Sequence, residues 1–231
     1  MTPLILLPGL ACDAALFRDQ TPALAARGPV HLSDVHTRAT TLPAMAALLL
    51  AEHPGPLALA GSSMGGMLAL AMWRLAPERV RGLALLGSSA RADTPAQQQL
   101  RRDGISAFEQ GRMDEVLRAN VHFAFHPAHA AALTDDYLAM VQRAGPAQLI
   151  AQNRAVMARE DQRPHLAGIT CPTLVVGGED DLLTPPDCSR EMAAAIPGAE
   201  LLLLPRCGHL LTWEQPAAVT AALCAWRARV G

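Results

Sequence analysis

The sequence predicts an α/β fold, and three observations support this prediction. Short apolar runs recur along the chain, turn residues end each run, and helical patterns follow. Apolar runs without alternation are typical of strands buried on both faces, and strands that alternate with helices indicate a parallel sheet. We therefore expect a mostly parallel sheet of about six strands flanked by helices, with an inserted helical cap.

Six apolar runs account for the expected strands: LILL (4–7), VHLSDV (30–35), LALA (57–60), LALLG (83–87), TLVVGG (173–178) and ELLLL (200–204). Amphipathic stretches follow the first two runs, and Asp13 is placed to cap the first helix.

One interval, residues 91–165, breaks this alternation. It contains no strand pattern, and helical patterns follow one another with prolines and glycines between them. The interval is too long for an ordinary connection between a strand and the next. We predict an α/β core from residues 1–90 and 166–231, and a helical cap, or lid, from residues 91–165.

Composition excludes several classes of function. The chain has 231 residues, which suits one sizeable domain, and a formal net charge of −2. No basic field indicates binding to nucleic acid or to an anionic membrane. All 19 basic residues are arginine, so a phosphate-binding Walker lysine and a Schiff-base lysine are both excluded.

The expected location is the cytoplasm. No targeting segment is visible at the start of the chain, and no apolar run approaches the ~18–20 residues of a membrane helix. The five cysteines are scattered without paired spacing, which favours a reducing compartment.

The stretch GSSMGG (61–66) joins an expected strand to an expected helix and has the form G-x-S-x-G. This is the context of a nucleophile elbow, in which a sharp turn exposes the central serine, here Ser63. Glycines at 61 and 65 let the backbone fold closely. A packing turn is the competing interpretation. A dinucleotide-binding turn is disfavoured because no G-x-G-x-x-G is present.

A nucleophilic serine needs a base, and the base needs an acid to orient it. GGEDDLLTPP (177–186) follows the fifth expected strand, and PRCGHLLTWEQP (205–216) follows the sixth. Both lie where open parallel sheets place their sites. Asp181 and His209 are the candidates, and Asp93, just past the fourth strand, is a reserve candidate for the acid.

With these residues assembled, the chain resembles the α/β-hydrolase superfamily, in particular its small capped carboxylesterases and enol-lactone hydrolases. The resemblance runs from LLPGLACD through GSSMGG and GGEDDLLTP to GHLLTWEQP. It implies Ser63 as nucleophile, Asp181 as acid and His209 as base, and its G-x-x-D-x-x-x-P pattern selects Asp181 over the preceding Asp180. It also implies an oxyanion hole made by the backbone N–H groups of Leu10 and Met64.

The expected function is hydrolysis of a small-molecule carboxylic ester through an acyl-enzyme, without a metal or an organic cofactor. A thioesterase, a lactone hydrolase or a C–C hydrolase would use the same three residues, so these alternatives stay open. A non-catalytic binding protein on the same scaffold is a further alternative. The oligomeric state is not predicted.

Candidates for the substrate pocket are apolar cap residues: Phe123, Phe125, Leu138 and Met157. Packing within the cap explains them equally well. Four cap arginines are candidates for binding an acidic acyl carrier protein: Arg101, Arg102, Arg112 and Arg118. A solvated helix face is the simpler interpretation of these residues. The histidines of VHFAFHPAH lack a nearby acidic partner, and no metal site is expected there.

Overall fold

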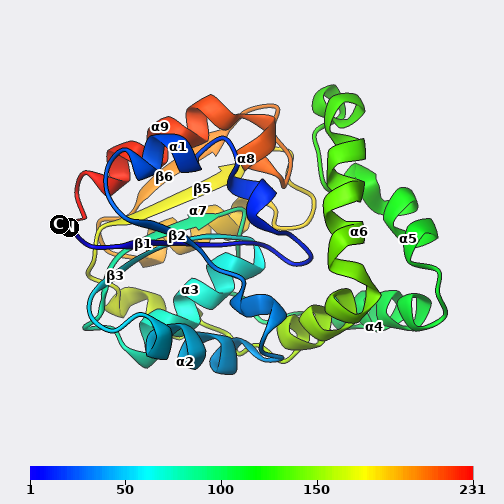
Figure 1. Cartoon of the computed structure of the whole chain (residues 1–231), viewed down its shortest axis with the longest axis horizontal. Helices are drawn as coiled ribbons and strands as arrows, with labels where there is room; N and C mark the ends of the chain where they lie inside the picture. Colours follow the sequence, from blue (N-terminus) through cyan, green and yellow to red (C-terminus); the bar gives the residue numbers. More distant parts are fainter. Residues whose placement is uncertain (231) are drawn as a thin grey trace.

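A six-stranded parallel sheet forms the centre of the computed structural model, which describes residues 1–230 (Figure 1). Its strands are β1 (Leu4–Leu7), β2 (Val30–Leu32), β3 (Leu57–Ser62), β4 (Val80–Leu86), β5 (Thr173–Gly178) and β6 (Glu200–Leu204). They are ordered β2-β1-β3-β4-β5-β6, and every neighbouring pair is parallel. The predicted fold class is therefore confirmed.

Helices cover both faces of the sheet (Figure 1). One face carries α2 (Leu42–Glu52), α3 (Met64–Leu75) and α7 (Pro186–Ala195), and the other carries α1 (Thr21–Ala25), α8 (Leu211–Glu214) and α9 (Pro216–Arg227). Short 3-10 helices are η1 (Ala14–Phe17), η2 (Val35–Thr37), η3 (Val121–Phe123) and η4 (Arg163–Gly168). Asp13 caps η1 by accepting a hydrogen bond from the Ala15 amide, as the sequence predicts.

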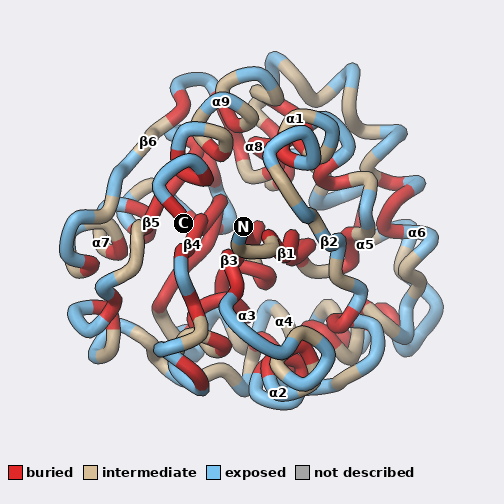
Figure 2. Tube along the Cα trace, turned by 60° about the vertical axis from the view of Figure 1, so that its left-hand side comes forward, coloured by how far each residue is buried: buried red, intermediate tan, exposed pale blue. Residues whose placement is uncertain are grey.

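The strands are apolar on both faces because each face packs into its own core. Ile5 and Leu7 of β1 pack with α2 and α3, whereas Leu4 and Leu6 pack with α1 and α9. All of β1, β3 and β5 is buried, and the strands run as red tubes through the centre of Figure 2. Alternate strand residues thus serve two cores.

Three strands differ from their predicted bounds, and the first of them, β3, extends beyond its apolar run to Ser62. β2 ends at Leu32, and residues 35–37 turn into η2 instead of extending the strand. β4 begins at Val80, earlier than its apolar run. Arg81 is exposed and interrupts the hydrophobic pattern, so the pattern alone did not reveal the start of the strand.

Three helices, α4 (Pro95–Glu109), α5 (Met113–Asn120) and α6 (Pro127–Met157), lie between β4 and β5. Together they form a helical insertion at the carboxyl end of the sheet, opposite the chain termini (Figure 1). Thr94 and Gln97 form a capping box at the start of α4, and Pro95 occupies its first turn. Gly145, with φ 73°, breaks α6 directly before Pro146, where the sequence places a break.

No helix within residues 1–230 is long and apolar enough to cross a membrane. The five cysteines, all in this part of the chain, are free.

Candidate active site

Ser63 stands on a sharp turn between β3 and α3. Its backbone adopts φ 53° and ψ −115°, a left-handed conformation that is unfavourable for a residue with a side chain. The turn is held from β4 and the loop after it: the Ser63 amide donates to the Leu86 carbonyl at 2.8 Å, and Ser88 Oγ donates to the Ser63 carbonyl at 2.8 Å. These bonds fix the direction of the Ser63 side chain.

The glycines of GSSMGG are required by space. A Cβ at Gly61 would lie 2.2 Å from the Gly65 carbonyl oxygen, and one at Gly65 would lie 2.0 Å from the Leu7 carbonyl oxygen. Strand β1 therefore approaches the start of α3 at a distance that only glycine permits. The turn is built to expose Ser63 at the carboxyl edge of the sheet.

Ser63 belongs to a chain of hydrogen bonds that joins three loops. Ser63 Oγ lies 3.0 Å from His209 Nε2, and His209 Nδ1 lies 2.8 Å from Asp181 Oδ2. With Nδ1 donating to the carboxylate, Nε2 is left to accept from the serine hydroxyl. The structure thus brings together the three residues predicted from separate parts of the sequence.

Asp181 is buried and fully hydrogen-bonded. Its Oδ1 accepts from the amides of Leu183 and Thr184 at 2.8 and 2.9 Å, and its Oδ2 accepts from Thr184 Oγ1 at 2.7 Å as well as from His209. Burial alone would raise the pKa of this carboxyl group, but the charge of His209 and these hydrogen bonds outweigh it and hold the pKa below its usual value. Asp181 therefore remains an acceptor at neutral pH.

The loop that carries His209 is anchored by Glu214, whose side chain is completely buried. Both Glu214 carboxylate oxygens accept from the Gly208 amide at 3.0 Å, and Oε2 also accepts from the His126 amide at 2.8 Å. The His209 amide itself donates to the Ala124 carbonyl at 3.1 Å. The sequence analysis missed Glu214, and an acid inside the apolar pattern HLLTWEQP was the available signal.

Two opposing influences set the pKa of His209. Burial, the largest of them, lowers it, whereas the negative charge of Asp181, its hydrogen bond and the charge of Glu214 raise it. The net result is a pKa above the ordinary histidine value. The neutral ring, which can accept a proton, thus predominates only at a pH above this raised pKa.

Leu10 and Met64 are the residues whose backbone N–H groups are expected to form an oxyanion hole. Leu10 follows Gly9 in the loop after β1, Met64 opens α3, and both residues line the same cavity as Ser63. Their neighbours are engaged elsewhere: the Ala11 amide donates to Gln152 Oε1 at 2.7 Å, and the Cys12 amide donates to the Gly9 carbonyl at 3.1 Å. Gln152, buried on α6, was not predicted, and it fixes this loop against the helical insertion.

The sequence model of the alpha/beta hydrolase family matches residues 4–223. The chain belongs to the alpha/beta hydrolase family.

The relatives of this chain are named for different reactions. A putative non-heme bromoperoxidase, BpoC, of Mycobacterium tuberculosis is 28% identical over 88% of this chain and 80% of its own length. A putative carbamate hydrolase, RutD, of Azorhizobium caulinodans is 30% identical over 87% of this chain and 81% of its own. The structure of a thermophilic esterase from Thermogutta terrifontis superposes with a TM-score of 0.88 at 26% identity, covering 100% of this chain and 90% of its own.

In this alpha/beta hydrolase, a cavity of about 200 Å³ opens beside Ser63 and His209. The helical insertion contributes Arg101, Tyr137, Asn153 and Val156 to its wall. Burial raises the pKa of the Cys12 thiol, which also lines the cavity, to about 12, so this cysteine stays neutral. The cavity is small, and Arg101 places a charged side chain in its wall.

The four predicted pocket residues do not line this cavity. Phe125 packs in the core edge-on against Tyr137, and Leu138 is buried in a cluster within the insertion. The cavity is lined by Tyr137 and Val156, the direct neighbours of Leu138 and Met157. Phe123 stacks near His122 in η3. The sequence analysis located the right stretches of helix, but it selected the wrong face of each one.

Asp93 and three of the four cap arginines do not line the cavity beside Ser63. Asp93, the reserve acid, is paired instead with Arg101 and Arg159, at 2.7 and 2.8 Å. Of the four cap arginines, Arg101 is the one that lines the cavity. Within residues 1–230, no three histidine, cysteine or acidic side chains are grouped as a metal site would require.

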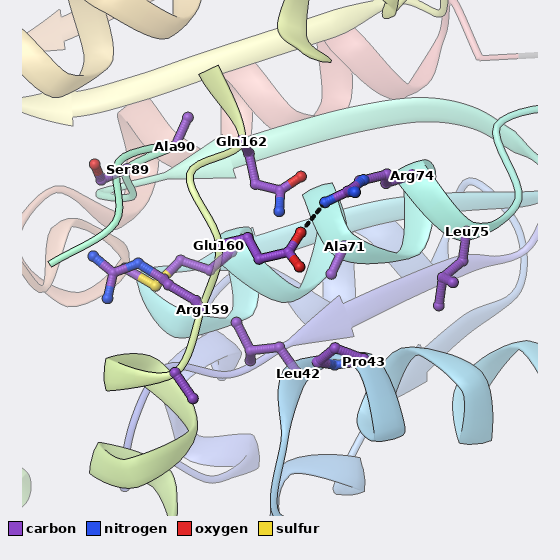
Figure 3. Close-up of a pocket in the computed structure, with 12 residues that line it drawn as sticks. Leu42, Pro43, Ala71, Arg74, Leu75, Ser89, Ala90, Arg159, Glu160 and Gln162 are labelled. Atoms are coloured by element: carbon purple, nitrogen blue, oxygen red, sulfur yellow. Dashed lines mark hydrogen bonds and ion pairs between the residues drawn. The ribbon is translucent and has the colours of Figure 1, made fainter. Parts of the chain in front are cut away.

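A larger cavity, of about 460 Å³, lies outside this site between α2, α3 and the segment after α6 (Figure 3). Arg74 and Glu160 form an ion pair within it, and apolar residues such as Leu42 and Ala71 make up much of its wall. Met67 is shared with the smaller cavity, but neither Ser63 nor His209 reaches the larger one. Because Ser63 and His209 line the smaller cavity and not the larger one, the smaller cavity is the candidate active site.

Proposed function

We propose that this protein is a serine hydrolase that cleaves small-molecule carboxylic esters through an acyl-enzyme. The observation that carries the proposal is the continuous hydrogen-bonded chain from Ser63 through His209 to the buried Asp181, opening onto a cavity. A serine on a strained turn, a buried acid and a partly buried histidine between them match the requirements of nucleophilic catalysis.

In the first half of the proposed reaction, Ser63 Oγ attacks the carbonyl carbon of the ester, and His209 Nε2 takes the hydroxyl proton. Asp181 holds the proton on Nδ1 and stabilises the imidazolium that forms. The alcohol then leaves with the proton held by His209. A water molecule, deprotonated by His209, attacks the acyl-enzyme and releases the acid.

The negative charge on the carbonyl oxygen would be stabilised by the N–H groups of Leu10 and Met64. Both residues line the cavity at Ser63, and the amino end of α3 adds its favourable dipole. In a comparable hydrolase, one donor of this kind lowers the barrier by about 3–4 kcal/mol. No residue of the proposed mechanism requires a metal or an organic cofactor.

The decisive experiment is turnover of a series of p-nitrophenyl esters of rising acyl length, combined with labelling by a fluorophosphonate. We expect hydrolysis of short esters, since the cavity holds about 200 Å³, and stoichiometric labelling of Ser63 found by peptide mass spectrometry. Binding of the esters without turnover would support a binding protein on this scaffold instead. Labelling of a residue other than Ser63 would contradict the proposed nucleophile.

The pH dependence of kcat/KM provides a further prediction. Activity should rise with pH through a single ionisation whose midpoint lies above the unperturbed histidine pKa of ~6.5, because Asp181 and Glu214 raise the pKa of His209 against burial. The protonated ring cannot accept the serine proton, so activity is lost as pH falls. Glu214→Gln should move the midpoint down. A wild-type midpoint below the unperturbed value would contradict this assignment.

We further propose that the protein acts in the cytoplasm on a dissolved small molecule. Five free thiols support a reducing compartment. The net charge of −2 offers no attraction to nucleic acid or to an anionic membrane surface.

A further inference from the structure

Arg101 places a positive charge in the wall of the candidate active site. It lies on α4, its side chain is 28% exposed, and it lines the cavity together with Ser63 and His209. Its neighbour Arg102 differs in environment, because it is exposed and binds the side chain of Gln99 on the same helix. Two adjacent arginines therefore have opposite surroundings, one in the site and one in solvent.

Two fixed partners hold the guanidinium group of Arg101. Its Nε donates to Asp93 Oδ2 at 2.7 Å, and its Nη1 donates to Asn153 Oδ1 at 2.9 Å. Asn153 is buried and is itself held by a hydrogen bond from its Nδ2 to the Leu149 carbonyl at 2.8 Å. Within residues 1–230 no hydrogen bond uses Arg101 Nη2, so a rigidly held guanidinium keeps donors to offer.

Asp93, the one acid in the described chain that pairs with Arg101, is shared with a second arginine. The buried carboxylate of Asp93 faces two guanidinium groups, those of Arg101 and Arg159, so the three side chains together carry one positive charge. The neighbouring acids Asp161, Asp187 and Glu191 compensate Arg91, Arg159 and Arg163. Within residues 1–230 none of these three acids pairs with Arg101, so its Nη2 group stays available to an anion supplied from outside.

The cavity provides no such anion. Within the described chain, no aspartate or glutamate lines it, and its other titratable residues are Cys12, Tyr137 and His209. Burial raises the pKa values of Cys12 and Tyr137, so both remain neutral. The charge of Arg101 does reach the site, because it lowers the pKa of His209, as burial does, against the stronger opposing effect of Asp181.

We propose that Arg101, oriented by Asp93 and Asn153, binds a carboxylate carried by the substrate, so that the enzyme prefers anionic esters over neutral ones. The inference rests on the proposed esterase function and names its substrate class. A guanidinium group held from one side and open on the other suits the planar, two-oxygen shape of a carboxylate. Recognition of this kind also fixes the register of the ester relative to Ser63.

The test compares matched anionic and neutral substrates. Mono-p-nitrophenyl succinate, glutarate and adipate carry a carboxylate on the acyl side, and p-nitrophenyl butyrate is their neutral partner. 4-Acetoxybenzoate and phenyl acetate form the corresponding pair for the alcohol side. For each pair, the quantity measured is kcat/KM for the anionic ester divided by kcat/KM for the neutral one.

We expect this ratio to exceed one in the wild type for at least one pair, and to fall at least about tenfold in Arg101→Gln, as the loss of a hydrogen bond between charged groups requires. Arg102→Gln removes the same charge one residue away and should leave the ratio unchanged. Arg101→Lys keeps the charge beside Asp93 without the planar fork, and its ratio should be intermediate. Glutarate should inhibit wild-type hydrolysis of p-nitrophenyl butyrate competitively, and Arg101→Lys more weakly.

The outcomes separate the two proposals. Failure of the wild type to hydrolyse any ester would overturn the esterase function itself. Hydrolysis that depends on Ser63 but has the same ratio in the wild type, both Arg101 variants and Arg102→Gln would overturn the role of Arg101 and leave the esterase function standing. If Arg101→Gln does not fold, Arg101→Lys and the glutarate inhibition decide the question.

Discussion

Replacement of Ser63 with alanine is expected to lower esterase kcat/KM by at least about a thousandfold, because within residues 1–230 Ser63 carries the one hydroxyl group that hydrogen-bonds His209 Nε2. The variant should fold normally. The Ser63 hydroxyl contributes a single hydrogen bond. The strained turn is held through the backbone of Ser63, whose amide donates to the Leu86 carbonyl and whose carbonyl accepts from Ser88 Oγ. Activity should be measured with p-nitrophenyl butyrate, and folding by thermal melting.

Ser62→Ala is the matched control for Ser63→Ala. Ser62 precedes the nucleophile position and ends β3, where it pairs with Leu86 of β4; within residues 1–230 no hydrogen bond joins it to His209. We expect this variant to retain most of the wild-type activity. Equal losses in the two variants would indicate a disrupted turn, and wild-type turnover in Ser63→Ala would remove Ser63 as the nucleophile.

The sequence could bring forward Ser63, Asp181 and His209 as candidates because strand direction and local backbone geometry limit where they lie. Gly61 and Gly65 indicate a close turn around Ser63. The loops after β5 and β6 must lie at the same edge of the sheet as Ser63, because all the strands are parallel. Such constraints lie within a few residues or follow from strand direction. A motif in the sequence therefore carries them completely.

The cavity wall was not predictable in the same way. Which face of α6 meets the sheet depends on how the insertion docks, and a hydrophobic pattern scores Tyr137 and Leu138 alike as apolar. The same limit applies to the arginines: nothing local distinguishes Arg101 from Arg102. The difference arises from Asp93 and Asn153, which lie 8 and 52 residues away from Arg101 in the chain.

Replacement of Asp181 with asparagine is expected to lower kcat about as severely as the corresponding change does in a serine protease, roughly ten-thousandfold. Asp181 Oδ2 accepts the Nδ1 proton of His209 at 2.8 Å. An asparagine amide oriented by Thr184 and Leu183 can present an N–H group to Nδ1, which moves the proton of the ring to Nε2. His209 would then donate to Ser63 instead of accepting from it, and the base would be lost.

Asp180→Asn provides the comparison, since Asp180 carries the same charge one residue earlier. Its side chain is 49% exposed and faces His126 at 4.0 Å, away from the hydrogen-bonded chain of Ser63. We expect only a modest change in kcat. The two variants should be compared by kcat with p-nitrophenyl butyrate. Thermal melting should be measured as well, because the Asp180 amide donates a hydrogen bond to the Cys207 carbonyl and so helps to hold the loop after β5. Equal losses in both variants would mean that the loop was disrupted, whereas inactivity in Asp180→Asn alone would transfer the acid to that residue. Full activity in Asp181→Asn would show that His209 is oriented without a carboxylate.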